Sequence, residues 1–268
     1  MTKIEIHEVG PRDGFQNVAE YIPLEDKLQI IDALVHTGVQ HIQITSFVSP
    51  KAIPQMRDAK ELAQQCVYRY PDIDLYALVP NLRGARDAWE AGIRKISYVV
   101  SLSESHNRAN INRTHAMSRE ELQSIREELP DLQVSLDLAT AFGCPFEGIK
   151  QAQQVVDFLQ PFIELAPQVV NLCDTIGIAH PNQIRQAIDA VRDAYPSQAL
   201  QLHIHDTRNM GVVNTLAGIE RGVTSVQSTL GGLGGCPDAP GASGNLATED
   251  LVWMLNRMGY ETGIDSAA

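Results

Sequence analysis

The stretch from residue 3 to residue 38 reads KIEIHEVGPRDGFQNVAEYIPLEDKLQIIDALVHTG and contains a strand followed by a helix. Residues 3–9 have the isoleucine- and valine-rich composition of a strand. In residues 24–38 apolar side chains recur at i, i+3 and i+4, the spacing of one face of a helix, and Gly38 is a typical helix-ending residue. A strand that leads into a helix in this way predicts a parallel sheet with helices packed on it.

The same alternation continues along the chain. Further strands are expected at residues 41–45, 74–79, 95–100, 133–139, 169–174, 200–205 and 224–229, and further helices at 83–92, 119–129 and 181–194. About eight such units in 268 residues, with no linker-like stretch between them, predict one catalytic domain over residues 1–268. We expect an α/β fold of the closed (β/α)8 TIM-barrel type, and an open doubly wound sheet is the alternative.

The composition limits the class of protein. The 21 basic and 33 acidic residues give a net charge of −12, which argues against a nucleic-acid surface. No apolar run reaches the ~18–20 residues of a membrane helix, and the first apolar stretch is interrupted by polar residues, unlike a signal peptide. The four cysteines show no CxxC spacing, which argues against a structural zinc site or a disulfide framework. We therefore expect a soluble, cytoplasmic protein.

Polar residues gather where the expected strands end. We expect the first strand to end at Arg12–Asp13, the second at Thr45–Ser46, the fourth at Ser101–Glu104 and the sixth at Asp174–Thr175. In a (β/α)8 barrel the functional side chains lie at the C-terminal face of the strands. The pattern predicts an active site at that face.

The sharpest local signal is LHIHD at residues 202–206. Side chains two apart in a strand project to the same face, so His203 and His205 are expected to point together into the barrel mouth. Asp13 ends the first strand, which in a closed barrel lies beside the eighth strand and near the seventh. A carboxylate and two imidazoles with open positions favour Mg2+ or Mn2+, and Zn2+ or Co2+ is also chemically acceptable. The alternative is a pair of histidines that are hydrogen-bonded in a polar barrel mouth.

Several segments resemble the 3-hydroxy-3-methylglutaryl-CoA lyase family, in the same order along the whole chain. They are EVGPRDGFQN (8–17), TSFVSPK (45–51), FGCPFEG (142–148), CDTIG (173–177), HIHDT (203–207) and GGLGGCPDAPGASGNLATEDL (231–251). The resemblance implies a metal-dependent (β/α)8 lyase that cleaves 3-hydroxy-3-methylglutaryl-CoA, or a closely related 3-hydroxyacyl-CoA, by retro-Claisen chemistry. The products would be acetyl-CoA and a 3-oxo acid such as acetoacetate. The resemblance also implies that Asn245 joins Asp13, His203 and His205 as a metal ligand, and it suggests a homodimer.

The chemistry of that family gives further residues a role. The leaving thioester enolate needs a positioned cation, for which Arg12 is the candidate; a salt bridge across the barrel mouth is the alternative. Cys236, in the glycine-rich loop, corresponds to the family's proposed proton donor to the enolate carbon, with His203 or a metal-bound water as the alternative. Asp174 corresponds to a catalytically important acidic residue. The glycines of the loop are expected to let it cover a ligand as a lid.

Other positions match the family or depart from it. The matching positions are Gln16, Ser46, Ser49, Lys51 and Glu249; Gln16 and Ser46 are candidate substrate contacts, and Lys51 is a candidate for the coenzyme A phosphates. Gln43 stands where the family has a glutamate. GFQNVA (14–19) stands where the family has GLQNE followed by a lysine, so this chain lacks that glutamate–lysine pair. Arg208 and Asn209 replace an aromatic residue and a glycine. We expect Arg208 either to bind a carboxylate or phosphate of the substrate or to form a surface ion pair.

Two other functions are compatible with these residues. One is a Claisen-type synthase or aldolase of the same metallolyase superfamily that acts on a 2-oxo acid, although such relatives usually lack the GGLGGCP loop. The other, suggested by Gln43, is a non-catalytic protein that binds coenzyme A or a metal. The expected partner of the leading interpretation is an acyl-CoA thioester, with no nucleic acid and no membrane.

Overall fold

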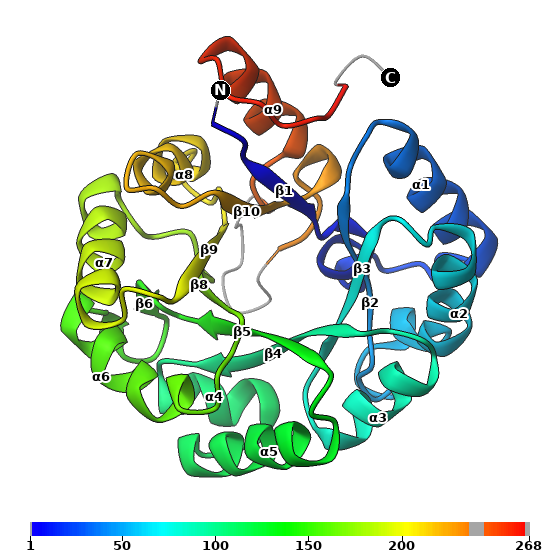
Figure 1. Ribbon diagram of the computed structural model, residues 1–268, viewed down its shortest axis with the longest axis horizontal. Coiled ribbons are helices and arrows are strands. Elements are labelled where there is room, and N and C mark those ends of the chain that lie inside the picture. The colour runs from blue at the N-terminus through cyan, green and yellow to red at the C-terminus, as the bar shows by residue number, and fades with distance from the viewer. Residues whose placement is uncertain (1, 236–243, 266–268) are drawn as a thin grey trace.

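The computed structural model describes residues 2–235 and 244–265. Parallel strands close into a barrel, and helices surround it (Figure 1). In the order of their pairing around the barrel the strands are β1 (Glu5–Glu8), β10 (Ser225–Ser228), β9 (Ala199–Ile204), β8 (Val169–Asp174), β5 (Gln133–Ala139), β4 (Lys95–Ser101), β3 (Asp74–Val79) and β2 (His41–Ser46). The barrel closes because β1 pairs with β10 in register from Glu5–Ser225 to Glu8–Ser228. The expected (β/α)8 barrel is confirmed, and the open sheet is wrong.

Helices lie between the strands and cover the outside of the barrel (Figure 1). They are α1 (Leu24–His36), α2 (Ala59–Arg69), α3 (Leu82–Glu90), α4 (Glu104–Ile111), α5 (His115–Glu128), α6 (Ala152–Ile163), α7 (Pro181–Ala194), α8 (Gly211–Ile219) and α9 (Thr248–Arg257). A small antiparallel pair, β6 (Gly143–Cys144) with β7 (Gly148–Ile149), stands apart from the barrel. Within the described ranges, no helix combines the length and the apolar character needed to span a membrane.

The first strand is shorter than expected. β1 ends at Glu8, and Gly10–Gly14 form a π-helical turn instead of continuing the strand to Arg12–Asp13. Pro11 lies at the start of this turn and has no backbone N–H to give to a strand ladder. The turn places Arg12 and Asp13, both buried, over the end of the barrel.

Two other strands end where they were expected to end, at the first residue of their polar runs. β4 ends at Ser101, because Ser103 begins α4 by accepting a hydrogen bond from the backbone N–H of His106 at 3.1 Å. β8 ends at Asp174, and Thr175 lies outside it. The glycine-rich segment that follows β10 begins with a short 3-10 turn at Leu230–Gly232.

Polar side chains fill the inside of the barrel. Along each strand, apolar residues that pack under the helices alternate with buried polar residues, as in Leu136 and Leu138 beside Asp137. The buried polar residues of the strands include Gln43, Ser97, Ser135, Asp137, Asn171, Gln201 and Gln227. Gln227 of β10 reaches Tyr76 of β3, a strand that is not its neighbour, at 3.4 Å. Buried polar groups need hydrogen-bond partners, so this interior is a network of side chains instead of the usual aliphatic layers.

Candidate functional site

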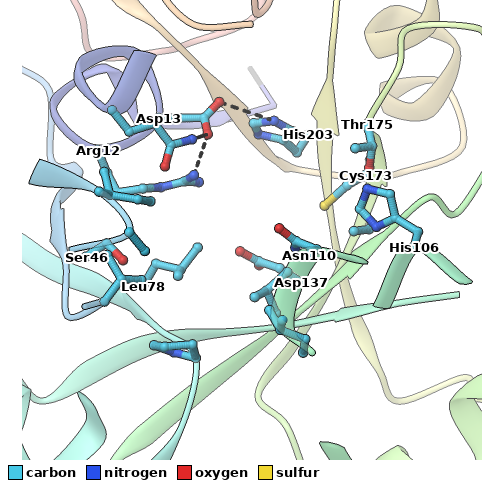
Figure 2. A pocket seen from close by; sticks show the side chains of 18 of the residues that line it. Arg12, Asp13, Ser46, Leu78, His106, Asn110, Asp137, Cys173, Thr175 and His203 are labelled. Atoms are coloured by element: carbon cyan, nitrogen blue, oxygen red, sulfur yellow. Dashed lines mark hydrogen bonds and ion pairs between the residues drawn. The ribbon is translucent and has the colours of Figure 1, made fainter. Parts of the chain in front are cut away.

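A pocket of about 420 Å³ lies at the C-terminal end of the barrel strands, where the sequence predicts the active site. Figure 2 shows that its side chains come from opposite sides of the barrel and point toward one another. The polar residues that line it include Arg12, Asp13, Gln16, Ser46, Ser49, His106, Asn110, Asp137, Thr175, His203, His205 and Gln227.

The turn after β1 holds Arg12 and Asp13 as a buried ion pair, with both residues 7% exposed. Nη1 of Arg12 donates to Oδ1 of Asp13, and Nε donates to Oε1 of Gln43. Burial raises the pKa of Asp13, but the Arg12 guanidinium and the imidazoles of His203 and His205 lower it to about 2. The Asp13 carboxylate is therefore ionised, and the Arg12 side chain is held in one orientation from two sides.

Asp13, His203 and His205 meet in one cluster. One ligand atom from each lies within 4.8 Å of the others. Nε2 of His203 lies 3.1 Å from Nε2 of His205 and 3.9 Å from Oδ2 of Asp13. Burial and the neighbouring His205 lower the pKa of His203 to about 3, and burial also lowers the pKa of His205. Both rings are therefore neutral near pH 7, which is the form of imidazole that binds metals.

Asn245 joins this cluster through the chain that follows the glycine-rich loop. It forms an isolated antiparallel bridge with His205, one residue beyond β9, and Nδ2 of Asn245 donates to Oδ2 of Asp13 at 2.6 Å. Oδ1 of Asn245 and Nδ1 of His205 are buried and have no hydrogen-bond partner among the described residues. An unpartnered amide oxygen beside a carboxylate and two neutral imidazoles fits a divalent cation.

The structure places the other predicted residues in different surroundings. Gln16 and Ser46 line the pocket; Nε2 of Gln16 donates to Oδ1 of Asp13 at 2.9 Å, and Oγ of Ser46 is buried with no hydrogen-bond partner in the described part of the chain. Lys51 is exposed. Cys236 lies outside the described residues.

Asp174 and Arg208 are not among the described residues that line the pocket. The Asp174 carboxylate accepts from the backbone N–H groups of Ile178 at 3.1 Å and Ala179 at 3.0 Å, and burial raises its pKa to about 6. Nη1 of Arg208 donates to the carbonyl of Gly177 at 3.0 Å. Both side chains therefore hold the turn after β8, and their part in catalysis or substrate binding stays a prediction.

Asp137 is a pocket carboxylate that the sequence analysis did not identify. It is buried, and its Oδ1 accepts from Nδ2 of Asn171 at 3.1 Å. Burial raises its pKa to about 6. The available signal for Asp137 was the alternation in QVSLDLA (133–139), because it places this residue on the inner face of its strand.

Gln43, which replaces the glutamate of the family, accepts a hydrogen bond from Arg12 as a carboxylate would, and it donates to Oγ of Ser97 at 3.0 Å.

Glu8 is a second carboxylate that the sequence analysis missed. Its Oε1 accepts from the backbone N–H groups of Gly10 at 2.7 Å and Leu230 at 2.9 Å, and its Oε2 accepts from Oγ1 of Thr248 at 2.7 Å. It therefore joins the turn that carries Arg12 to the start of the glycine-rich segment and to α9. Glu249 supports the same segment by accepting from the N–H of Gly231 at 2.9 and 3.0 Å.

Glu8 makes the stability of the fold depend on pH. Burial raises its pKa from 4.5 to about 7. Because the folded pKa is the higher one, the stability that the bound proton contributes is full below pH 4.5 and is lost as the pH rises through 7. The difference between the folded and unfolded pKa of Glu8 corresponds to about 3 kcal/mol in the free energy of unfolding. We expect Glu8→Gln, which stays neutral and can donate to Thr248, to remove that loss when the free energy of unfolding is measured by urea denaturation at successive pH values.

The exposed Glu61→Gln is the control for this measurement and is expected to leave the pH profile of the parent protein unchanged. A Glu8→Gln profile that falls between pH 4.5 and 7 as steeply as that of the parent would contradict the assignment.

Comparisons with known proteins agree on one family. The HMGL-like family model matches residues 3–268. The hydroxymethylglutaryl-CoA lyase of Bacillus subtilis is 41% identical over 264 residues, which are 98% of this chain and 88% of the relative. Curated relatives of the same enzyme name include mitochondrial and cytoplasmic proteins.

Two solved structures share the fold closely. The HMG-CoA lyase from Brucella melitensis has a TM-score of 0.94 and 36% identity, and the match covers 100% of this chain and 95% of that one. An HMG-CoA lyase from Acinetobacter baumannii, solved in complex with coenzyme A and 3-methylmalate, has a TM-score of 0.93 and 40% identity over 99% of this chain and 87% of that one.

Proposed function

The chain belongs to the HMGL-like family, and from this we propose that it is a divalent-metal-dependent carbon–carbon lyase. Its substrate would be 3-hydroxy-3-methylglutaryl-CoA or a closely related 3-hydroxyacyl-CoA, and its products acetyl-CoA and a 3-oxo acid such as acetoacetate. The observation that carries the proposal is the cluster of Asp13, His203, His205 and Asn245 beside Arg12 at the barrel mouth. The pocket volume of about 420 Å³ falls within the ~300–1,000 Å³ of small-molecule sites.

Asp13, His203, His205 and Asn245 would hold the cation. One carboxylate and one amide oxygen favour Mg2+ or Mn2+, and two imidazoles also admit Zn2+ or Co2+. When bound, the cation supplies Lewis-acid chemistry that acidifies the 3-hydroxyl group of the substrate. Gln16 and Ser46, which line the same pocket, are the proposed contacts for the acyl group.

Arg12 would stabilise the charge that develops during cleavage. The 3-hydroxyl group gives its proton to water in the pocket and becomes a carbonyl. The C2–C3 bond breaks, and its electron pair moves onto the thioester as an enolate. A fixed guanidinium stabilises that enolate oxygen without having to reorganise, because Asp13 and Gln43 already hold it.

The enolate carbon then needs a proton, for which we propose Cys236. A thiol with an ordinary pKa of ~8.5 is mostly protonated at neutral pH and can donate. His203 is less suited to this transfer, because its Nδ1 lies against Oε1 of Gln227 at 2.9 Å and its Nε2 faces Asp13 and His205. A cytoplasmic location, a homodimer and a substrate contact at Arg208 stay predictions of the sequence.

Cleavage of the thioester tests the proposal directly. We expect purified protein that has been stripped with a chelator to release acetyl-CoA and acetoacetate from 3-hydroxy-3-methylglutaryl-CoA only after Mg2+ or Mn2+ is added. The measurement is acetyl-CoA by chromatography, repeated with other 3-hydroxyacyl-CoA thioesters. Release from none of them would contradict the lyase function, whereas acetyl-CoA consumption with a 2-oxo acid would support the synthase or aldolase alternative.

A further inference from the structure

Gln227 lies directly beside His203 because of the register of two neighbouring strands. β10 pairs with β9 so that Gln227 is opposite His203 and Ser225 is opposite Gln201. Registered residues on parallel strands project to the same side, which here is the inside of the barrel. Both Gln227 and Gln201 are buried there. The register therefore places one amide against the metal-binding imidazole and a second amide behind the first.

Hydrogen bonds connect these side chains in a chain in which each amide nitrogen donates to the next side chain. Oε1 of Gln227 lies 2.9 Å from Nδ1 of His203. Nε2 of Gln227 donates to Oε1 of Gln201 at 3.1 Å and to the hydroxyl of Tyr76 at 3.4 Å, and Nε2 of Gln201 donates to Oγ of Ser225 at 2.7 Å. With its amide nitrogen engaged in this way, Gln227 presents only its oxygen to the ring.

An amide oxygen can only accept, so with the Gln227 amide in this orientation Nδ1 of His203 carries the ring proton. The other nitrogen, Nε2, then keeps its lone pair on the side that faces Asp13 and His205. Only this tautomer can serve as a ligand at that position, and outer partners of metal-binding histidines commonly select it.

We propose that Gln227 is a positioning residue that sets the tautomer and orientation of His203, with Gln201 and Tyr76 fixing the direction of the Gln227 amide. The inference rests on the cation site of the proposed function but not on the reaction. It assigns the ligand a neutral outer partner, in which an amide does what a carboxylate does at many metal sites. Gln227 itself need not contact the reacting atoms.

The test compares cation affinities, which do not depend on turnover. We expect Gln227→Met, which has a similar size but no acceptor, to bind Mn2+ about 10–100-fold more weakly than the parent protein. Gln227→Glu restores an acceptor and is expected to bind Mn2+ at least as tightly as the parent. The readout is free Mn2+ measured by electron paramagnetic resonance during titration.

Gln183→Met is the matched control. Gln183 is also a buried glutamine, and its Nε2 donates to the carbonyls of Phe142 at 2.6 Å and Lys150 at 3.0 Å, away from the cluster. We expect this variant to lose stability in urea and keep the Mn2+ affinity of the parent. Equal losses of affinity in Gln183→Met and Gln227→Met would overturn the inference, as would unchanged affinity in Gln227→Met.

Nitrogen-15 NMR of histidine-labelled parent protein tests the tautomer without any substitution, and so covers the case of a Gln227→Met variant that does not fold. A proton on Nδ1 of His203 supports the inference, and a proton on Nε2 overturns it. A parent protein that binds no Mn2+ would remove the cation site and the inference together. A parent that binds Mn2+ and shows the Nδ1 proton but cleaves no thioester would contradict only the proposed lyase reaction.

Discussion

Asp13→Asn protein is expected to lose its affinity for Mn2+ by more than about 100-fold and to lose thioester cleavage with it. Removing only an outer partner of a ligand costs about 10–100-fold in affinity, and this change removes the one anionic member of the proposed ligand set. The substitution also exchanges an acceptor for a donor opposite Arg12, Gln16 and Asn245, all of which donate to the Asp13 carboxylate. The measurements are Mn2+ titration and acetyl-CoA release at saturating cation.

Asp58→Asn separates the loss of a ligand from the loss of a buried ion pair. Asp58 pairs with the buried Lys27 at 2.8 Å, and its side chain is as buried as that of Asp13. We expect Asp58→Asn to lower the free energy of unfolding and to keep the cation affinity of the parent. Tight Mn2+ binding by Asp13→Asn would place the cation elsewhere and contradict the ligand set.

Arg12→Gln is expected to lower kcat by about 10²–10³-fold, the effect of removing one donor that stabilises a developing oxyanion. The free energy of unfolding should fall, because the change breaks a buried ion pair. The Mn2+ affinity should not fall, because Asp13 keeps its bonds from Gln16 and Asn245. Arg12→Lys keeps the charge but cannot bond Asp13 and Gln43 at once, so its kcat should lie between that of the parent protein and that of Arg12→Gln. Steady-state kinetics with saturating cation measures all three proteins.

Arg86→Gln is the matched control for this series. Arg86 forms an ion pair with Glu128 on the surface, where both side chains are about half exposed. Such surface pairs contribute little to the free energy of unfolding. We expect its kcat and KM to equal those of the parent. A large rise in KM with unchanged kcat in Arg12→Gln would show that Arg12 binds the substrate in its ground state and does not stabilise the enolate.

The fold was predictable because its signal is local and repeated. Most strands lie in short runs rich in β-branched and apolar residues, and the expected helices have their apolar residues on one face, as in α1 and α7. The expected end of the first strand at Arg12–Asp13 was wrong. The strand ends at Glu8, and the chain turns at Gly10–Gly14, where Pro11 has no N–H to give to a strand ladder.

The site was predictable only in part because its contacts are between distant residues. His203 and His205 share a face of one strand, so their spacing in the sequence brings them together. Asn245 reaches His205 across the glycine-rich loop, and no spacing rule predicts that contact; only the family resemblance indicated it. Asp137 and Gln227 were missed because their partners are set by strand register, which a single parallel strand does not specify.

The barrel closes through the contact between β1 and β10, which can form only after β10 has been synthesised late in translation. β1 leaves the ribosome more than 200 residues before Ser225–Ser228, so the edge of β1 that pairs with β10 stays unpaired while most of the barrel is synthesised. The proposed cation site is completed later still, when Asn245 reaches His205. A nascent chain that is arrested before Asn245 is synthesised carries Arg12 and Asp13 but lacks one of the four proposed cation ligands. The proposed chemistry therefore depends on a ligand set that is completed only late in synthesis.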